Sequence, residues 1–198
     1  MNIFIDTEFT DLLAPELLSL GMVTDHGAEF YAELDLKSDV GKARFASSSD
    51  FVREVVFDMW GRIDGAASGH QELASRAARW LTQCAAKAGG PIAVAFDYGA
   101  DWSLLQAALA EVGAWQQLAP VIRGANVSSL TETIEGEIGA EAALGEIAHR
   151  GLLRHHALAD ARALRGAYQY YMAMTRRSQR ASVTRQLRDA QKREEGEL

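Results

Sequence analysis

The sequence predicts an α/β fold in which a mixed central β-sheet is flanked by helices. Three observations favour this fold: strand-like apolar runs open the chain, a short strand feeds an amphipathic helix near its middle, and helical periodicity dominates its last third. The chain has 198 residues, of which 48% are hydrophobic and 24% charged. This length is enough to bury one core, and this balance is ordinary for a globular protein.

Three consecutive strands are predicted at the start of the chain. Residues 2–9 begin apolar and end polar, as expected of a central strand that reaches a functional site. Residues 17–24 and 29–36 are the next two strands, and the Asp-His-Gly turn at 25–27 predicts that they form an antiparallel hairpin.

Helices are expected to alternate with one further strand through the middle of the chain. Ser and Asp residues at 47–50 offer N-caps for a helix through Phe51 to Met59, and a second amphipathic helix is expected over 71–87. Gly89-Gly90-Pro91 ends that helix before a strand at 92–96, which leads into a helix that begins near Asp101. This strand-to-helix step is typical of an α/β sheet.

The last third is expected to be helical. Short helical pieces separated by Gly136, Gly139 and Gly145 are predicted between 128 and 149, followed by a longer helix over 157–174. We therefore expect one domain over 1–174 and a basic polar tail over 175–198. The tail is interpreted as a solvated, fraying helix or a disordered segment, with an electrostatic arm for a nucleic acid backbone as the alternative.

Composition and charge limit the functional classes. The single cysteine, Cys84, excludes an internal disulfide and a multi-cysteine zinc site. No signal peptide and no stretch long enough to span a membrane is recognised, so a cytoplasmic location without membrane association is expected. The formal net charge of −7 argues against a protein that holds nucleic acid by charge alone, whereas carboxylates covered by divalent cations are compatible with it.

Two carboxylates stand two residues apart at the end of the first strand. Because side chains alternate between the faces of a strand, Asp6 and Glu8 are expected to project from the same face. Neighbouring carboxylates are unfavourable unless a cation covers them, and their oxygens suit hard ions such as Mg²⁺ or Mn²⁺. The pair therefore predicts a divalent metal site.

Two further groups of residues can complete such a site. His155 and Asp160 are five residues apart, which lets a histidine before a helix and an aspartate in its first turn approach one point. Asp101 stands at a strand-to-helix junction, where an α/β site is expected, although it would also serve as an N-cap. Asp97 at the same junction is the competing candidate.

Together these residues resemble the DEDDh exonucleases of the ribonuclease H-like fold. The three motifs occur in the order found in that family: Phe4-Ile5-Asp6-Thr7-Glu8-Phe9, then Asp101-Trp102-Ser103-Leu104-Leu105, then His155 to Asp160. The Asp-Thr-Glu-Phe opening and the His-x-Ala-Leu-x-Asp-Ala-Arg ending are most similar to the small bacterial 3′-to-5′ exoribonucleases related to ribonuclease T. The resemblance covers residues 1–174.

This resemblance implies a reaction and a set of roles. Asp6, Glu8, Asp101 and Asp160 would hold two Mg²⁺ ions, which Mn²⁺ can replace, and His155 would act as general base towards the attacking water. The implied product is a nucleoside 5′-monophosphate, released from the 3′ end of single-stranded or 3′-overhang RNA. Contacts with the substrate are expected from Phe9, Thr7 and Trp102.

Other interpretations stay open from the sequence alone. A DNA-directed 3′-to-5′ exonuclease of the proofreading type would use the same metal chemistry, because discrimination depends on contacts with the 2′-hydroxyl that one sequence does not locate. A catalytically inactive nucleic-acid-binding module on the same fold is a second alternative. Similarity in size to family members that form dimers suggests a homodimer.

Overall fold

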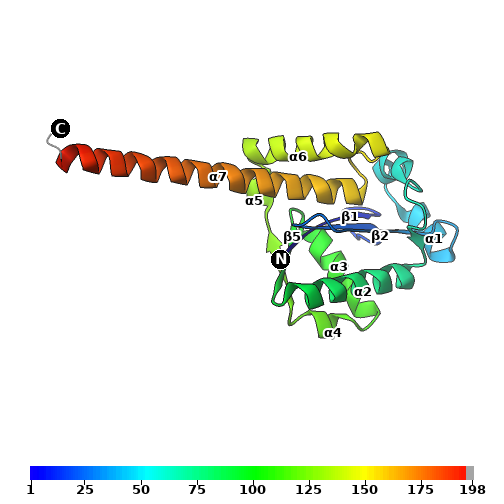
Figure 1. Ribbon diagram of the computed structural model, residues 1–198. Coiled ribbons are helices and arrows are strands. Elements are labelled where there is room, and N and C mark those ends of the chain that lie inside the picture. Colours follow the sequence, from blue (N-terminus) through cyan, green and yellow to red (C-terminus); the bar gives the residue numbers. More distant parts are fainter. Residues whose placement is uncertain (195–198) are drawn as a thin grey trace.

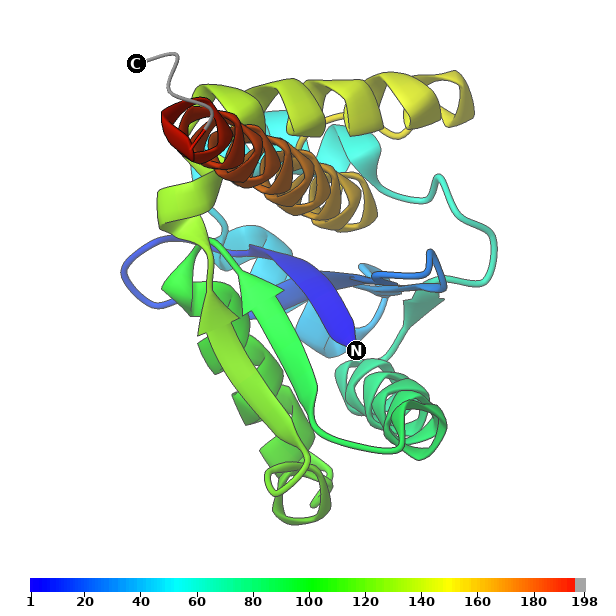
Figure 2. The same ribbon diagram turned by 60° about the vertical axis from the view of Figure 1, so that its left-hand side comes forward.

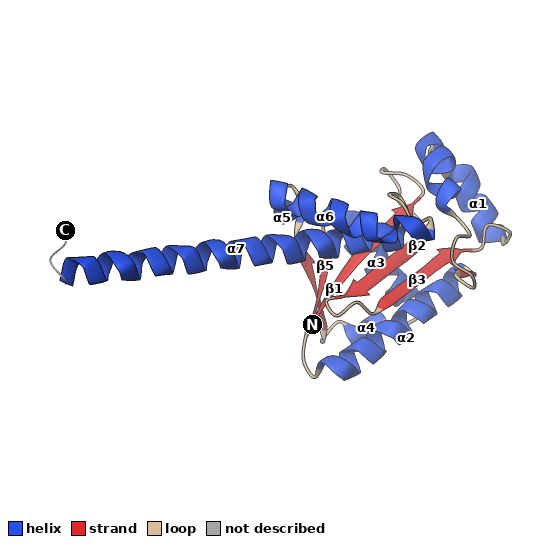
Figure 3. Ribbon diagram, turned by 45° about the horizontal axis from the view of Figure 1, so that its top comes forward, coloured by secondary structure: helices blue, strands red, loops and turns tan. Residues whose placement is uncertain are grey.

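The computed structural model describes residues 1–194. Its centre is a six-stranded mixed sheet with the strand order β4-β3-β2-β1-β5-β6 (Figure 3). The strands are β1 (Asn2–Phe9), β2 (Leu17–Thr24), β3 (Glu29–Leu34), β4 (Ala67–Ser68), β5 (Ile92–Phe96) and β6 (Ile122–Asn126). β1, β2 and β3 pair antiparallel, whereas β5 is parallel to β1 and to β6, and β4 is parallel to β3.

Helices cover both faces of this sheet in separate layers. On one face lie α2 (His70–Ala88), α3 (Gly99–Glu111) and the short α4 (Trp115–Leu118). On the other lies α7 (Ala157–Glu194), and α6 (Ile134–Ile147) packs on the side of α7 that faces away from the sheet (Figures 1 and 2). The α/β fold with a mixed, helix-flanked sheet is thus confirmed, and it is compatible with the ribonuclease H-like arrangement.

The predicted strands and most helices lie where the sequence places them. β1, β2 and β5 have the expected bounds, and β3 ends two residues earlier than predicted. The antiparallel β2–β3 pairing confirms the hairpin at residues 25–27. α2 ends at Gly89, whose left-handed backbone (φ 63°) suits glycine.

The region after β3 differs from the prediction. An additional helix, α1 (Asp39–Ser47), starts at Ser38, whose hydroxyl accepts a hydrogen bond from the Gly41 amide. The helix predicted through Phe51 to Met59 is a π-helical turn η1 (Val52–Val56) followed by a 3₁₀ turn η2 (Phe57–Met59). The edge strand β6 was not predicted, because only its first residue, Ile122, is fully buried and no alternating apolar pattern marks it.

The glycines at 136, 139 and 145 do not break the chain into short pieces, which corrects the prediction. Residues Ser128–Thr131 form the short helix α5, and α6 then continues without a break through all three glycines. A Cβ atom on Gly139 would lie 2.3 Å from the Gly166 carbonyl oxygen of α7, so this position needs glycine for close helix packing. A short 3₁₀ turn, η3 (Ala148–Arg150), follows α6.

The domain boundary predicted at residue 174 falls inside a continuous helix. α7 begins beside the sheet and continues as a single helix to Glu194, well past the body of the protein (Figure 1). The predicted tail is therefore helical over its described part, whereas residues 195–198 lie outside the described residues.

Two layers of core hold the sheet in place. The larger cluster lies between the sheet and α2 and α3 and includes Ile5, Leu81 and Leu105. The second lies between the sheet, α6 and the start of α7. Cys84 is buried, and burial raises the pKa of its thiol. No helix in residues 1–194 is long and apolar enough to cross a membrane.

Candidate metal centre

The second half of β1 presents two carboxylates on one face of the sheet. Asp6 and Glu8 alternate with Thr7, so they point towards α7 while Thr7 points away. β5 pairs with β1 only as far as Phe4, so the edge of β1 beyond that residue is open to other elements. The start of α3 takes this place. The strand therefore delivers both carboxylates beside a junction between the sheet and two helices.

α7 brings the third carboxylate. Oxygen atoms of Asp6, Glu8 and Asp160 lie within 4.8 Å of one another, a spacing that could hold a metal ion. The helix approaches the sheet this closely because position 21 of β2 is glycine: a Cβ atom there would lie 2.2 Å from the carbonyl oxygen of Ala157, the first residue of α7. The close approach of β2 and α7 therefore places Asp160 over β1.

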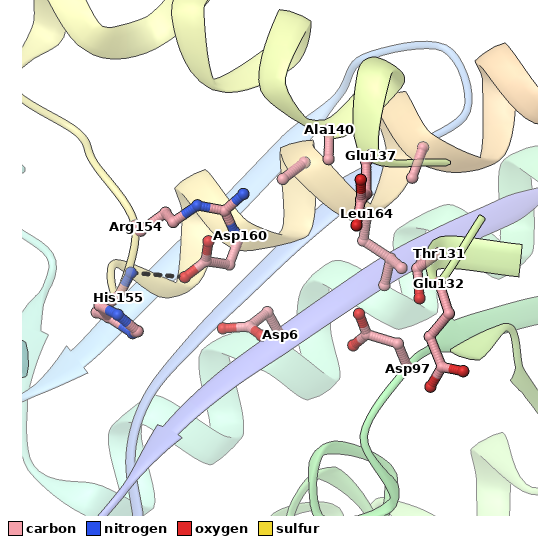
Figure 4. A pocket seen from close by; sticks show the side chains of 12 residues that line it. Asp6, Asp97, Thr131, Glu132, Glu137, Ala140, Arg154, His155, Asp160 and Leu164 are labelled. Atoms are coloured by element: carbon pink, nitrogen blue, oxygen red, sulfur yellow. Dashed lines mark hydrogen bonds between the residues drawn. The ribbon is translucent and has the colours of Figure 1, made fainter. Parts of the chain in front are cut away.

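His155 belongs to the same site. Its backbone N–H donates a 2.7 Å hydrogen bond to Asp160 Oδ2, and its side chain lines one cleft with Asp6 and Asp160 (Figure 4). His155 has a left-handed backbone (φ 66°), which is uncommon outside glycine. Its ring meets that of Phe51 edge to face, with centroids 5.1 Å apart. The two residues of the third motif are thus held together by the turn that starts α7.

Asp101 is fixed from the opposite side of β1. Its Oδ1 accepts hydrogen bonds from the Thr7 amide (3.1 Å) and the Thr7 hydroxyl (2.6 Å). The residue is only 1% exposed, and among the described residues its Oδ2 is buried without a partner. A buried carboxylate oxygen without a donor is unfavourable, and a nearby cation would satisfy it. Asp101 is, however, not among the described residues whose oxygen atoms lie within 4.8 Å of one another.

The electrostatics of this cluster also favour a cation. Burial, followed by repulsion from Asp160, raises the pKa of Glu8 to about 8, and burial raises that of Asp101 to about 7. Burial and then repulsion from Asp160, Glu8 and Asp101 raise the pKa of Asp6 well above its usual value. The pKa of Asp160 is also raised by burial, although the His155 N–H opposes this effect. Burial away from water and mutual repulsion both disfavour the ionised carboxylates, and a bound divalent ion offsets both effects.

The cleft beside these carboxylates has a volume of about 440 Å³ and extends along α7. Asp97, the alternative to Asp101, is exposed in this cleft near Asp6 (Figure 4). Asp101, in contrast, is buried behind β1. Arg154 lines the cleft close to Asp160 and pairs with Glu141 of α6. Sequence reasoning did not single out Arg154, although its position directly before His155 is a signal that could have done so.

A second cavity, which Glu8 helps to line, is strongly apolar. Its volume is about 350 Å³. The residues that line it are Glu8, Phe9, Asp11, Leu12, Ser49, Phe51, Val52 and Val56. Phe9, a predicted substrate contact, therefore lies beside the carboxylates, and its ring also stacks on Tyr98 with centroids 6.1 Å apart. An aromatic-lined cavity next to Glu8 could receive a flat apolar group.

Thr7 and Trp102, the other two predicted substrate contacts, do not line the cleft. Thr7 is buried and points away from the cleft, where it holds Asp101. The ring of Trp102 stacks on Phe96 and packs against Gly124 of β6, and the residue lines neither the cleft nor the apolar cavity. The structure therefore does not bring Trp102 to the site.

His156, the residue after His155, has a structural role. It is 1% exposed, and its Nδ1 accepts a 3.2 Å hydrogen bond from the Leu158 amide at the start of α7. Its ring stacks on Tyr31 at a centroid distance of 4.3 Å, and burial lowers its pKa to about 4. An imidazole in these surroundings is neutral and turned away from the cleft.

A comparison with protein-family profiles finds none that matches the chain, and a comparison with curated protein sequences finds no significant similarity.

Proposed function

We propose that this chain is a metal-dependent 3′-to-5′ exonuclease of the DEDDh class that acts on RNA. The observation that carries the proposal is the convergence of Asp6, Glu8 and Asp160 within 4.8 Å, with the backbone N–H of His155 donating a hydrogen bond to Asp160. Asp101 is held behind β1 by Thr7. These five residues stand in the order of the family motifs, and Asp6, Glu8 and Asp160 meet although they come from the first strand and the last helix.

The donor set fits hard divalent cations. Asp6, Glu8, Asp101 and Asp160 would hold Mg²⁺, or Mn²⁺ in its place, because carboxylate oxygens are the ligands these ions prefer. Bound Mg²⁺ lowers the pKa of attacking water and stabilises negative charge that develops on phosphate oxygens. A phosphodiester is the substrate class for which this chemistry is most useful.

The protein's own side chains supply proton transfer and positioning. His155 lines the cleft, where its imidazole would accept the proton of the attacking water. Phe9 and Phe51 line the apolar cavity beside Glu8 and would receive the terminal base by stacking. Because stacking tolerates any base, we expect little sequence preference at the terminal nucleotide.

The test is degradation of a 5′-labelled RNA with a 3′ overhang, beside a DNA of the same sequence, in Mg²⁺ and in chelator. We expect stepwise shortening from the 3′ end of the RNA in Mg²⁺ only, with release of nucleoside 5′-monophosphates. Asp6→Asn and His155→Ala should each lose about 10²-fold or more in rate. Asp64→Asn, a carboxylate outside both cavities, is the matched control.

Activity that persists in chelator, or in Asp6→Asn with the fold retained, would refute the proposal. Faster degradation of the DNA would replace RNA by DNA as the substrate. The homodimer implied by the family resemblance stays a prediction, which sedimentation of the purified protein checks.

A further inference from the structure

The part of α7 that projects from the body is strongly basic. Between Thr175 and Gln186 it carries arginines and no acidic residue, although the whole chain has a formal net charge of −7. These arginines are Arg176, Arg177, Arg180 and Arg185, and they lie on the projecting, solvent-facing part of the helix. This stretch, residues 175–186, is called the basic arm below.

The basic arm is rigidly connected to the candidate metal centre. Asp160 lies in the first turn of the same uninterrupted helix. At about 1.5 Å per residue, Arg176 lies about 24 Å from Asp160 along the helix axis, and Arg185 lies about 38 Å away. The cleft that contains Asp160 is also lined by Leu164 and Ala167, so it runs along α7 towards the arm. Figure 4 shows Asp160 and Leu164 in this cleft.

The composition of the arm favours a polyanion over other partners. A coiled coil with a second copy needs apolar residues that repeat every three or four positions, and a helix that lies on a membrane needs an apolar face. Within 175–186 the aliphatic side chains are Ala181 and Val183 only. Arginine, in contrast, binds phosphate oxygens through a planar fork of N–H donors.

We propose that the basic arm binds the phosphate backbone of the substrate strand several nucleotides away from the 3′ end that occupies the metal centre. This proposal rests on the proposed exonuclease function and adds to it a preference for long strands. Because a stacked strand rises about 3.4 Å per nucleotide along its axis, the distance of about 24 Å between Asp160 and Arg176 corresponds to about seven nucleotides. A trinucleotide cannot reach the arm, whereas a 20-nucleotide strand can.

The test replaces all four arginines by glutamine in the Asp6→Asn background, so that binding is measured without hydrolysis. Glutamine keeps a high helix propensity, and far-UV circular dichroism checks that α7 is retained. Binding of a labelled 20-nucleotide single-stranded RNA is measured over a series of salt concentrations. Because the variant no longer neutralises four phosphates of the strand, the slope of log K against log salt should become shallower by about 3.

Two controls make the result specific. Gln179→Ala combined with Ser182→Ala changes exposed arm residues without changing charge and should keep the original slope. In an otherwise wild-type protein, replacement of Arg176, Arg177, Arg180 and Arg185 by glutamine should slow degradation of the 20-nucleotide strand at least tenfold at low substrate concentration. Degradation of a trinucleotide should stay unchanged.

An unchanged salt slope would overturn the proposal. The proposal would also be overturned if the arginine-to-glutamine variant degraded the trinucleotide and the 20-nucleotide strand equally slowly. Two further results would contradict it: sedimentation that shows the arm joins two copies of the chain, or a variant that loses binding to anionic lipid vesicles but keeps binding to RNA. Failure of the proposed function is a separate result: RNA binding through the arm without any Mg²⁺-dependent cleavage would leave the arm as a binding element and exclude the exonuclease.

Discussion

Asp101 is held by two hydrogen bonds from a single residue, Thr7, which stands between the two carboxylates of β1. One strand thus provides Asp6 and Glu8 on one face and the support for Asp101 on the other. The alternation of side chains predicts the first of these features. It does not predict the second, because Thr7 and Asp101 are 94 positions apart and their contact depends on how α3 docks against the open edge of β1.

The Thr7 contact gives a prediction at the residue scale. Thr7→Val removes the hydroxyl donor to a buried carboxylate, so the free energy of unfolding should fall by about 1 to 3 kcal/mol. Catalytic rate with a saturating oligonucleotide should fall at least tenfold, because Asp101 loses its position. Both quantities are measured on the purified variant, by urea unfolding and by the cleavage assay.

Thr24→Val is the matched control, since the Thr24 hydroxyl is also buried on a strand and accepts a hydrogen bond from the Ala28 amide. It should lose stability and keep full activity. If Thr7→Val is destabilised but fully active, Asp101 has no part in the reaction.

The spacing of the third motif predicts only part of the surroundings of His155. The spacing from His155 to Asp160 predicts that the two residues meet, and they do. The left-handed backbone of His155 and the neighbouring ring of Phe51 are properties of the folded turn and of a distant segment. Only the folded structure shows which of the two adjacent histidines faces the cleft, because His156 is buried against Tyr31.

At the scale of elements, the contact between β2 and α7 determines whether the site assembles. A methyl group on Gly21 would overlap the first residue of α7. We therefore expect Gly21→Ala to lower the free energy of unfolding by about 1 to 3 kcal/mol, or more if α7 cannot shift. Urea unfolding gives this value, and Mg²⁺-dependent cleavage should fall with it because Asp160 moves away from Asp6.

Gly145→Ala provides the comparison. Gly145 lies within α6, and a Cβ atom there meets nothing within 4 Å. Alanine should stabilise this helix by up to about 1 kcal/mol. A Gly21→Ala protein as stable as Gly145→Ala would show that α7 is not seated on β2 as described.

The predictability of the elements follows from their burial. β1, β2 and β5 are mostly buried, and their apolar runs are readable from the sequence. The edge strands β4 and β6 lack such runs because fewer of their side chains are buried. In the sequence, Gly136 and Gly139 of α6 suggest helix breaks. In the structure they allow close contact with α5 and α7, which depends on tertiary packing.

At the scale of the whole molecule, the clustered carboxylates make stability depend on pH and on metal. The folded state raises the pKa of Glu8 to about 8 and that of Asp101 to about 7, so it binds protons more tightly than the unfolded chain. Stability is therefore lost as pH rises towards these values. His156, with a pKa lowered from 6.5 to about 4, acts in the opposite sense below pH 6.5 only.

The measurement is the melting temperature in chelator between about pH 6.5 and 8. It should fall across this range, and Mg²⁺ should raise it most at the upper end, because the cation binds the ionised form of the folded protein. In Asp6→Asn both the fall and the Mg²⁺ effect should be smaller, whereas Asp64→Asn should behave like the wild type. A melting temperature that is independent of both pH and Mg²⁺ would contradict a buried carboxylate cluster.

The sequence predicts the fold class but not the full length of the last helix, α7. Strand-to-helix alternation predicts a mixed sheet with helices on both faces, and that arrangement is observed. The continuation of α7 to Glu194 is not predictable in the same way, because a polar, highly charged segment has no apolar stripe that marks a helix.

Asp6, Glu8 and Asp160 are proposed to hold a divalent cation. Diffraction from crystals grown with Mn²⁺, recorded at a wavelength where manganese scatters anomalously, tests this proposal directly. We expect an anomalous peak about 2 Å from oxygen atoms of all three residues, and its loss in Asp6→Asn. Asp97, Glu132 and Glu137 also line the cleft. A peak held by these three residues instead, or no peak beside β1 at millimolar Mn²⁺, would contradict the proposed site.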